Sequence, residues 1–345
     1  MYYVHKSKHV MIELQKRGFL SKAKQRKGNG IMSKKKYKDT HIGKKKLTLK
    51  ENIFLTAMCL LPAAFIFVFK YMPMFGVVLA FKDFRYNKGI WGSDWSGLKN
   101  FAFIFKSGTL GRLVRNTVGL NALFIVTGMA FAVMVAIILY EIKSRKALKT
   151  YQTLILLPYF ISWVVASYIV YAVLNPSYGL LNGLLLKLGF EKVNWYGNPN
   201  YWPWILMICN IWKSFGYSSI VYYAALVGVD SSYFEAARLD GASKLQLVRH
   251  IILPFLTPII TIQFILAVGN IMRADFGMFY QVTRDVGTLY PVTDVLDTYA
   301  YRALMELSDI GMSSAVSFVQ SVVGCALILF TNWIVTRIEP DNALI

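Results

Sequence analysis

The stretch EAARLDGASKLQLVRHIILP, residues 235–254, is a polar and amphipathic segment that lies between two long apolar runs. Ser232 precedes Glu235 by three residues, and this spacing is typical of a capping box. In that motif the hydroxyl caps the start of a helix while the carboxylate reaches back to the amide of the capping residue. The stretch therefore predicts a short helix that begins beside Ser232.

The second half of the stretch predicts an elbow. Gly241 can adopt the left-handed conformation that ends a helix. Ser243 can cap a second, amphipathic helix that runs to Ile252 and is broken by Pro254. We therefore expect two short helices that meet at Gly241.

The composition places this elbow in a membrane protein. Of the 345 residues 56% are hydrophobic and 15% aromatic, and the mean hydropathy is +0.45, which is too apolar for a soluble domain of this length. The apolar runs are each long enough to cross the hydrocarbon core as a helix. The sequence predicts an all-α integral membrane protein with six transmembrane helices, at residues 53–69, 118–140, 151–174, 203–227, 255–272 and 313–335.

The net charge of +20 is concentrated at the N-terminus, where residues 1–50 carry sixteen Lys and Arg against two acids. This distribution argues against a nucleic-acid-binding protein and for a tail that stays in the cytoplasm, either on anionic lipid or as a solvated leader. Six spans then return the C-terminus to the same side and place the elbow there. The predicted organisation is a basic tail (1–51), a six-helix membrane domain (52–337) and a short cytoplasmic tail (338–345).

The spacing within the stretch is specific. It fits, without a gap, the pattern EAA, three residues, Gly, nine residues, Ile, one residue, Leu-Pro. An arbitrary elbow is typical of a connector on the membrane surface, but this pattern resembles the ATPase-docking loop of the permease subunits of bacterial ABC importers. The resemblance assigns ATPase coupling to Glu235, Ala236, Ala237, Gly241, Ile251, Leu253 and Pro254.

Further segments extend the resemblance over residues 52–337. LLPYFISWVV (156–165), GLLN (179–182), WYGNP (195–199) and NIWKSFGY (210–217) look like the carbohydrate branch of these permeases, which passes oligosaccharides or polysaccharide fragments. The resemblance implies a coupling helix between the fourth and fifth spans and a location in the plasma membrane of a bacterium.

The resemblance also implies partners. They are a second, homologous permease in a heterodimer, two cytoplasmic ATPase subunits, an extracellular solute-binding protein, the carbohydrate and membrane lipid. ATP and Mg²⁺ would be held by the ATPases, since the sequence has no GxxxxGK[ST] phosphate loop. We expect no catalytic residue, bound cofactor or metal site in this chain, because neither a hydrolase motif nor metal-ligand spacing occurs.

Lys213 is costly in the middle of a span, by roughly 2.5 to 3.5 kcal/mol on insertion scales, so we expect it to face a polar cavity. Polar residues recur at helical spacing on its span and on the next. Either they line a path for a hydroxylated substrate or they form interhelical hydrogen bonds that hold the bundle. The substrate-path candidates are Asn210, Lys213, Tyr217, Gln263, Asn270 and Arg273, and we expect Asp275 to pair with Arg273 or Lys213.

Two local features give further expectations. Pro158 removes a backbone hydrogen bond, so we expect a kink near Leu154. The loop at residues 276–311 contains five acids against two Arg, and we expect it to meet the external binding protein.

The competing class is a stand-alone secondary carrier or a membrane scaffold without ATPase coupling. A carrier needs a coupling-ion site of its own. Asp275 is the one acid near a span and outside the loops, and a single acid gives little support for a coupling-ion site. The spaced pattern at 235–254 therefore favours the importer permease.

Overall fold

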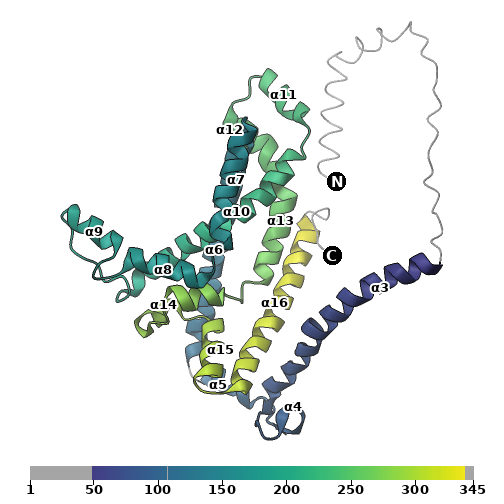
Figure 1. Ribbon diagram of the computed structural model, residues 1–345, viewed down its shortest axis with the longest axis vertical. Helices are drawn as coiled ribbons and strands as arrows, with labels where there is room; N and C mark the ends of the chain where they lie inside the picture. Colours follow the sequence, from purple (N-terminus) through teal and green to yellow (C-terminus); the bar gives the residue numbers. More distant parts are fainter. Residues whose placement is uncertain (1–48, 107, 339–345) are drawn as a thin grey trace. The chain divides into compact units, whose positions relative to one another are not determined.

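The computed structural model describes residues 49–106 and 108–338, and these residues are mostly helical (Figure 1). In this described part, strand is limited to one antiparallel pair, β1 (Lys82–Asp83) with β2 (Asp94–Trp95). The predicted all-α class is confirmed. The chain divides into two compact units, Met1–Phe65 and Ile66–Ile345. The predicted basic tail falls, up to residue 48, outside the described residues.

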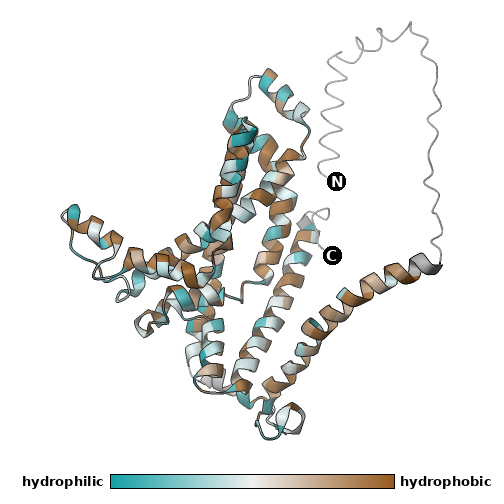
Figure 2. Cartoon of the chain, viewed as in Figure 1, coloured by the Kyte–Doolittle hydropathy of each residue, from teal (hydrophilic) through white to brown (hydrophobic). Residues whose placement is uncertain are grey.

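In the first unit, the described residues belong to the helix α3 (Leu49–Ile66). Most residues of this helix are hydrophobic along its length (Figure 2), without a polar stripe, which suits a helix surrounded by hydrocarbon. The helical path continues through η1 (Phe67–Tyr71) and η2 (Met72–Phe81).

In the second unit, α6 (Thr109–Glu141) packs along α10 (Trp202–Val227), and α13 (Leu253–Gly269) packs on α16 (Ile310–Ile338). Buried apolar side chains between these helices form three clusters. The shorter elements are α4 (Gly89–Gly92), α5 (Lys99–Lys106), α7 (Arg145–Phe160), α8 (Trp163–Leu174), α9 (Leu180–Lys187), η3 (Pro199–Tyr201), α11 (Ser231–Leu239), α12 (Lys244–Leu247), η4 (Val248–Ile252), η5 (Met278–Val282), η6 (Gly287–Leu289), α14 (Tyr290–Thr293) and α15 (Leu296–Met305).

Four helices in the described residues are long and apolar enough to cross a membrane: Ile53–Phe81, Thr109–Glu141, Lys244–Gly269 and Ile310–Arg337. The pair α7 and α8 gives a fifth if it is counted as one broken span. The remaining predicted span, 203–227, coincides with the 26-residue α10. The helices agree with the six predicted ranges for most of their length, and the count of six stays a prediction.

The bend in the third predicted span does not lie where the sequence suggested. α7 runs unbroken past Leu154 and Pro158, and the chain then bends by 96° between Phe160 and Trp163. Ser162 explains the position, because its extended backbone and its side chain, which accepts from Val165 N–H at 3.3 Å, start a new helix there. The sharp bend thus lies after Phe160, and the kink near Leu154 stays a prediction.

The acids of the 276–311 loop point largely inward. Asp294 is only 2% exposed and binds Arg302 and, at 3.5 Å, Arg112. Asp285 binds Arg302 at 3.0 Å. These four side chains form a balanced ion-pair cluster of two cations and two anions. Much of the acidity of the loop is therefore used inside the fold, and its contact with a binding protein stays a prediction.

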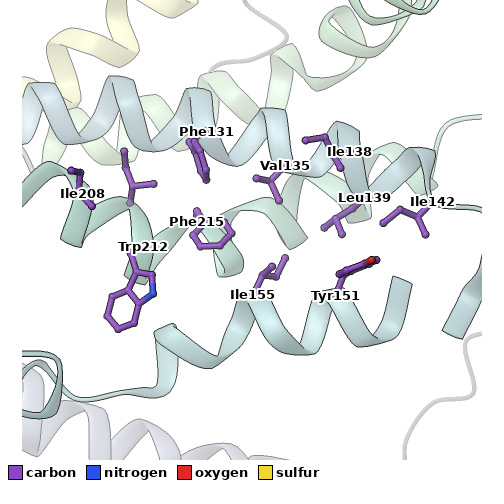
Figure 3. A pocket seen from close by; sticks show the side chains of 11 residues that line it. Phe131, Val135, Ile138, Leu139, Ile142, Tyr151, Ile155, Ile208, Trp212 and Phe215 are labelled. Atoms are coloured by element: carbon purple, nitrogen blue, oxygen red, sulfur yellow. The ribbon is translucent and has the colours of Figure 1, made fainter. Parts of the chain in front are cut away.

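A large groove in the second unit is apolar. It has a volume of about 760 Å³ and lies between α6, α7 and α10, whose side chains face it in Figure 3. Its lining consists of aliphatic and aromatic side chains: Phe131, Val135, Ile138, Leu139, Ile142, Tyr151, Ile155, Ile208, Ile211, Trp212 and Phe215. Such a wall gives few hydrogen bonds to a hydroxylated solute, so a polar site has to be sought elsewhere.

Candidate functional site

The segment around residues 235–254 begins with α11, whose N-cap is Asp230. The Asp230 carboxylate accepts from Ser232 N–H at 2.9 Å, and this hydrogen bond lowers the pKa of Asp230. The predicted capping box from Ser232 to Glu235 was wrong, because the carboxylate two residues earlier takes the capping role. Glu235 consequently lies in the middle of α11 with an exposed side chain.

Gly241 ends α11 as predicted. Its φ is +81°, in the left-handed region. Ala242 N–H donates to Ala237 O at 2.9 Å, and Gly241 N–H donates to Arg238 O at 3.1 Å. These two bonds form a Schellman motif, which satisfies the last carbonyls of the helix with backbone groups of the turn itself.

The second helix starts as predicted but does not end as predicted. Ser243 and Gln246 form a capping box at the start of α12. α12 then continues through the π-turn η4 into α13, so Pro254 does not break the helix. In η4 the amide of Leu253 donates to Val248 O, five residues back. This wider turn accommodates a proline, which has no N–H and crowds the carbonyl four residues before it.

The predicted coupling residues divide into two groups. Glu235, Ala236 and Gly241 are exposed at the turn of α11, whereas Ile251 packs beside a buried cluster that contains Ile252. Leu253 and Pro254 lie in the first turn of α13. The structure therefore brings the first group to a protruding turn and places the second group in the stem that carries it (Figure 1).

Residues outside the predicted set fix and extend this turn. Phe234 is 4% exposed and packs against Tyr140 of α6, with ring centroids 5.4 Å apart, and Lys244 binds Glu141 at 3.1 Å. Leu239 and Leu245, beside the turn, are 89% and 77% exposed. Two leucines held in solvent by an anchored turn indicate a surface for a partner. Their apolar type in a polar elbow was the sequence signal that could have identified them.

A second, polar site lies between α6, α10 and the end of α13. The cavity has a volume of about 240 Å³ and brings together three of the predicted substrate-path residues: Asn210, Asn270 and Arg273. Asn121 of α6 also lines it and was not predicted. The side-chain amide of Asn210 makes no hydrogen bond within the described part of the chain and is available to a solute.

The wall of this cavity is a break in the helical chain. α13 ends at Gly269, and the next six residues are not helical. Asn121 Nδ2 donates to Ile271 O at 2.8 Å and to Arg273 O at 3.0 Å, so α6 holds the break in place. Irregular backbone at membrane depth is tolerated where protein or a water-filled cavity satisfies it. A cavity beside a broken helix is a frequent place for a transported solute.

Lys213 makes interhelical hydrogen bonds, the second of the two roles left open for it. Its ammonium donates to the carbonyls of Pro158, at 3.4 Å, of Tyr159, at 3.1 Å, and of Ile161. These carbonyls lie in the last turn of α7 and at its C-cap, where intrahelical amide partners run out; Pro158 O also accepts from Ile161 N–H at 3.2 Å. Lys213 therefore caps α7 from a neighbouring helix, which supports its structural alternative.

The other predicted residues lie apart from the cavity. Tyr217 stacks on Tyr159, with centroids 5.0 Å apart, and Gln263 is half-buried on α13. Asp275 accepts from the indole of Trp163 at 2.5 Å. In the described residues it forms no ion pair with Arg273 or Lys213, so that predicted pairing was wrong.

Comparison with known proteins decides between the candidate classes. Residues 128–343 match the family described as binding-protein-dependent transport system inner membrane component. The chain belongs to this family. It is a multi-pass permease component of an importer, and the hydrolysis of ATP belongs to other subunits of such systems.

Relatives of this permease from Bacillus subtilis (strain 168) match nearly its whole length. It is 33% identical to the polygalacturonan/rhamnogalacturonan transport system permease protein YteP over 301 residues, which cover 87% of this chain and 93% of that protein. It is 30% identical to the protein LplB, with 85% and 92% of the two chains covered.

Solved structures share its fold. One is a bacterial ABC transporter involved in the import of the acidic polysaccharide alginate, with a TM-score of 0.76 and 30% identity, over 84% of this permease and 97% of that chain. Another is a bacterial alginate ABC transporter in complex with an alginate pentasaccharide-bound periplasmic protein, with a TM-score of 0.75, 30% identity and coverage of 84% and 96%. The predicted importer-permease fold is confirmed.

Proposed function

We propose that this permease forms half of the translocation pathway for an oligosaccharide or polysaccharide fragment, which an extracellular binding protein delivers. The other half is a second, homologous permease, and two ATPase subunits that bind ATP and Mg²⁺ drive the cycle from the cytoplasm. The protruding turn and both chain termini then lie on the cytoplasmic side. The location is the plasma membrane of a bacterium.

The observation that carries this proposal is the anchored turn between α11 and α12. Phe234 fixes its base against α6, the Schellman bonds at Gly241 fix its shape, and Leu239 and Leu245 present apolar surface at its tip. A rigid, apolar projection on the end of a membrane bundle is suited to insertion into a cleft of a soluble subunit. Neither a stand-alone carrier nor a scaffold needs such a projection.

The polar cavity supports the class of solute. Its amides and guanidinium can donate to hydroxyl and carboxylate oxygens, and Asn210 and Asn270 can also accept from hydroxyls. The relatives and structural neighbours that match most of this chain at 30% identity or more, and whose names state a substrate, are named for polygalacturonan, rhamnogalacturonan and alginate, and more distant relatives are named for trehalose/maltose and sn-glycerol-3-phosphate. An oligosaccharide is therefore the solute that the cavity and the relatives both favour.

In this proposal the turn transmits force. Closure of the ATPase pair on ATP draws the two permease turns together and rocks the helical bundles so that the cavity opens outward. Hydrolysis and release of phosphate reverse the motion. The break between α13 and η5 is held by Asn121 and moves with α6.

The test is purification of the tagged permease from mild detergent, followed by measurement of its copurifying subunits and of their ATP hydrolysis in proteoliposomes with the binding protein. We expect a second permease and ATPase subunits, with hydrolysis stimulated by an oligosaccharide. Leu239→Ser together with Leu245→Ser should release the ATPase, whereas Leu188→Ser, a matched change of an exposed leucine after α9, should not. A permease that purifies alone and transports without ATP contradicts the proposal.

A further inference from the structure

Two small cavities in the described part of the second unit are lined by arginine side chains. The first is the 240 Å³ cavity with Arg273, and the second, of about 230 Å³, is lined by Ser167, Tyr168, Tyr280, Gln281, Arg284 and Asp285. Two guanidinium groups thus face these cavities, against one carboxylate.

That carboxylate is already neutralised. Asp285 binds Arg302 at 3.0 Å, and Arg302 belongs to the balanced cluster with Asp294 and Arg112. The acid of the neighbouring α15, Asp297, accepts from Ala274 N–H at 2.7 Å and from Gln320 at 3.0 Å.

Arg273 and Arg284 lack a direct ion-pair partner, although Arg273 interacts with the Asp297 carboxylate at longer range. Within the described residues neither forms an ion pair. Arg273 donates only to the hydroxyl of Ser321, at 3.0 Å, and Arg284 lies over the ring of Tyr171, 4.2 Å from its centroid. Each contact leaves further N–H groups of the guanidinium free, because five donors are available. The two cavities therefore present net positive charge.

We propose that the oligosaccharide is anionic, with carboxylates of uronate residues, and that Arg273 is the residue that selects it. This inference rests on the proposed function and names its substrate class. A sugar carboxylate is planar and accepts two parallel N–H bonds from one guanidinium. In the same cavity the amides of Asn210 and Asn270 bind ring hydroxyls.

The position of Arg273 favours a role in selecting the anionic sugar over a neutral one. Arg273 lies in the irregular segment that Asn121 fixes through the Arg273 carbonyl, so its backbone is held. The Arg273 side chain is exposed, so its free N–H groups are accessible to a solute. A carboxylate can accept two charge-assisted hydrogen bonds from this guanidinium and a neutral sugar cannot, which is the basis of discrimination.

The experiment uses the complete transporter in proteoliposomes with its binding protein. The two probes are an oligogalacturonate trimer and the same trimer with its carboxylates methyl-esterified, and the readout is kcat/KM for stimulated ATP hydrolysis. We expect the wild type to prefer the acid, and Arg273→Gln to lower kcat/KM for the acid by about tenfold or more with little effect on the ester. Arg273→Lys, which keeps the charge but not the fork, should retain part of the preference.

The control is Lys187→Gln, which removes one positive charge from the exposed end of α9 and should change neither value. The same binding protein is used throughout, so any change in the ratio of acid to ester arises in the permease. An equal loss for both probes in Arg273→Gln, or a wild type that prefers the ester, overturns the inference while the proposed function stands. If neither these probes nor a neutral malto-oligosaccharide stimulates hydrolysis, both the inference and the proposed function fail.

Discussion

The second unit contains two sharp turns between helices, and they are built in opposite ways. At Gly241 the last carbonyls of α11 bond to amides of the turn itself, so every partner lies within five residues. At Ile161–Ser162 one local bond, from Ile161 N–H to Pro158 O, is supplemented by Lys213, which is 52 to 55 residues further along the chain and donates to the carbonyls of Pro158, Tyr159 and Ile161. The first turn is complete by itself, whereas the second exists only because α10 lies beside α7.

The difference follows from the surroundings of each turn. The Gly241 turn is exposed, where water can satisfy any group left without a partner. The bend after α7 belongs to an apolar pair of helices, where an unpaired carbonyl costs several kcal/mol. A long cationic side chain can satisfy several carbonyls at once, which also explains why a lysine is tolerated on α10. Changes at the bend should therefore affect the whole bundle, and changes at the turn should affect only the contact with a partner.

The largest effect is expected at Gly216. A Cβ on this residue would overlap the carbonyl of Ile155, so α7 and α10 are in direct backbone contact there. Gly216→Val should push α7 away from α10 and separate Lys213 from its carbonyls, at a cost of about 3 kcal/mol. The measurement is thermal stability of the purified permease in detergent, with Gly183→Val on exposed α9 as the control, since a Cβ there meets nothing. Equal stability of the two variants would show that the contact is absent.

Lys213→Met should have the next largest effect. It removes the side-chain donor of the Tyr159 and Ile161 carbonyls, whereas Pro158 O keeps its bond from Ile161 N–H, and we expect a loss of about 2 kcal/mol in stability. Lys213→Arg, which keeps the positive charge and has five N–H donors, should recover most of it. If Lys213→Met is as stable as the wild type but transports with an altered substrate dependence, the lysine lines the path after all and does not cap α7.

A smaller and more local effect is expected at Gly241. A left-handed backbone strains most residues that carry a Cβ by roughly 1 kcal/mol. Asn tolerates this conformation, and Gly, which has no Cβ, adopts it without strain. Gly241→Asp should spare insertion and pairing with the second permease but reduce the ATPase retained per permease after purification. Gly241→Asn is the matched control, because it fits the same conformation without charge. Full retention of the ATPase by Gly241→Asp would show that the turn does not couple the permease to the ATPase.

These two turns also show what the sequence could and could not predict. Gly241 and Ser243 act within a few residues, so their roles were legible in the motif. The partners of Lys213 and of Asn121 lie about 50 and 150 residues away, and only the packing of helices brings them together. The polar character of Lys213 was recognised, but its partner was not. For the same reason Asn210, Asn270 and Arg273 were chosen by spacing on their own helices, and Asn121 was missed.

The smallest effect is expected at the N-cap of α11, where Ser232 was predicted to be the capping residue and Asp230 is observed in that role. Asp230→Ala removes the acceptor for Ser232 N–H, so the first turn of α11 should exchange its amide hydrogens faster, while Ser232→Ala should leave exchange nearly unchanged.

The pKa of Asp230 is lowered by this hydrogen bond. The stabilisation that the bond gives to α11 is therefore present above the ordinary pKa of an aspartate and is lost as the pH falls through the lowered value. The difference between wild type and Asp230→Ala should therefore be full at pH 7 and should shrink as the solution is acidified. Hydrogen–deuterium exchange of residues 230–239 in the purified permease, corrected for the intrinsic rate at each pH, measures this. Faster exchange in Ser232→Ala than in Asp230→Ala would return the cap to the serine and restore Glu235 as its partner.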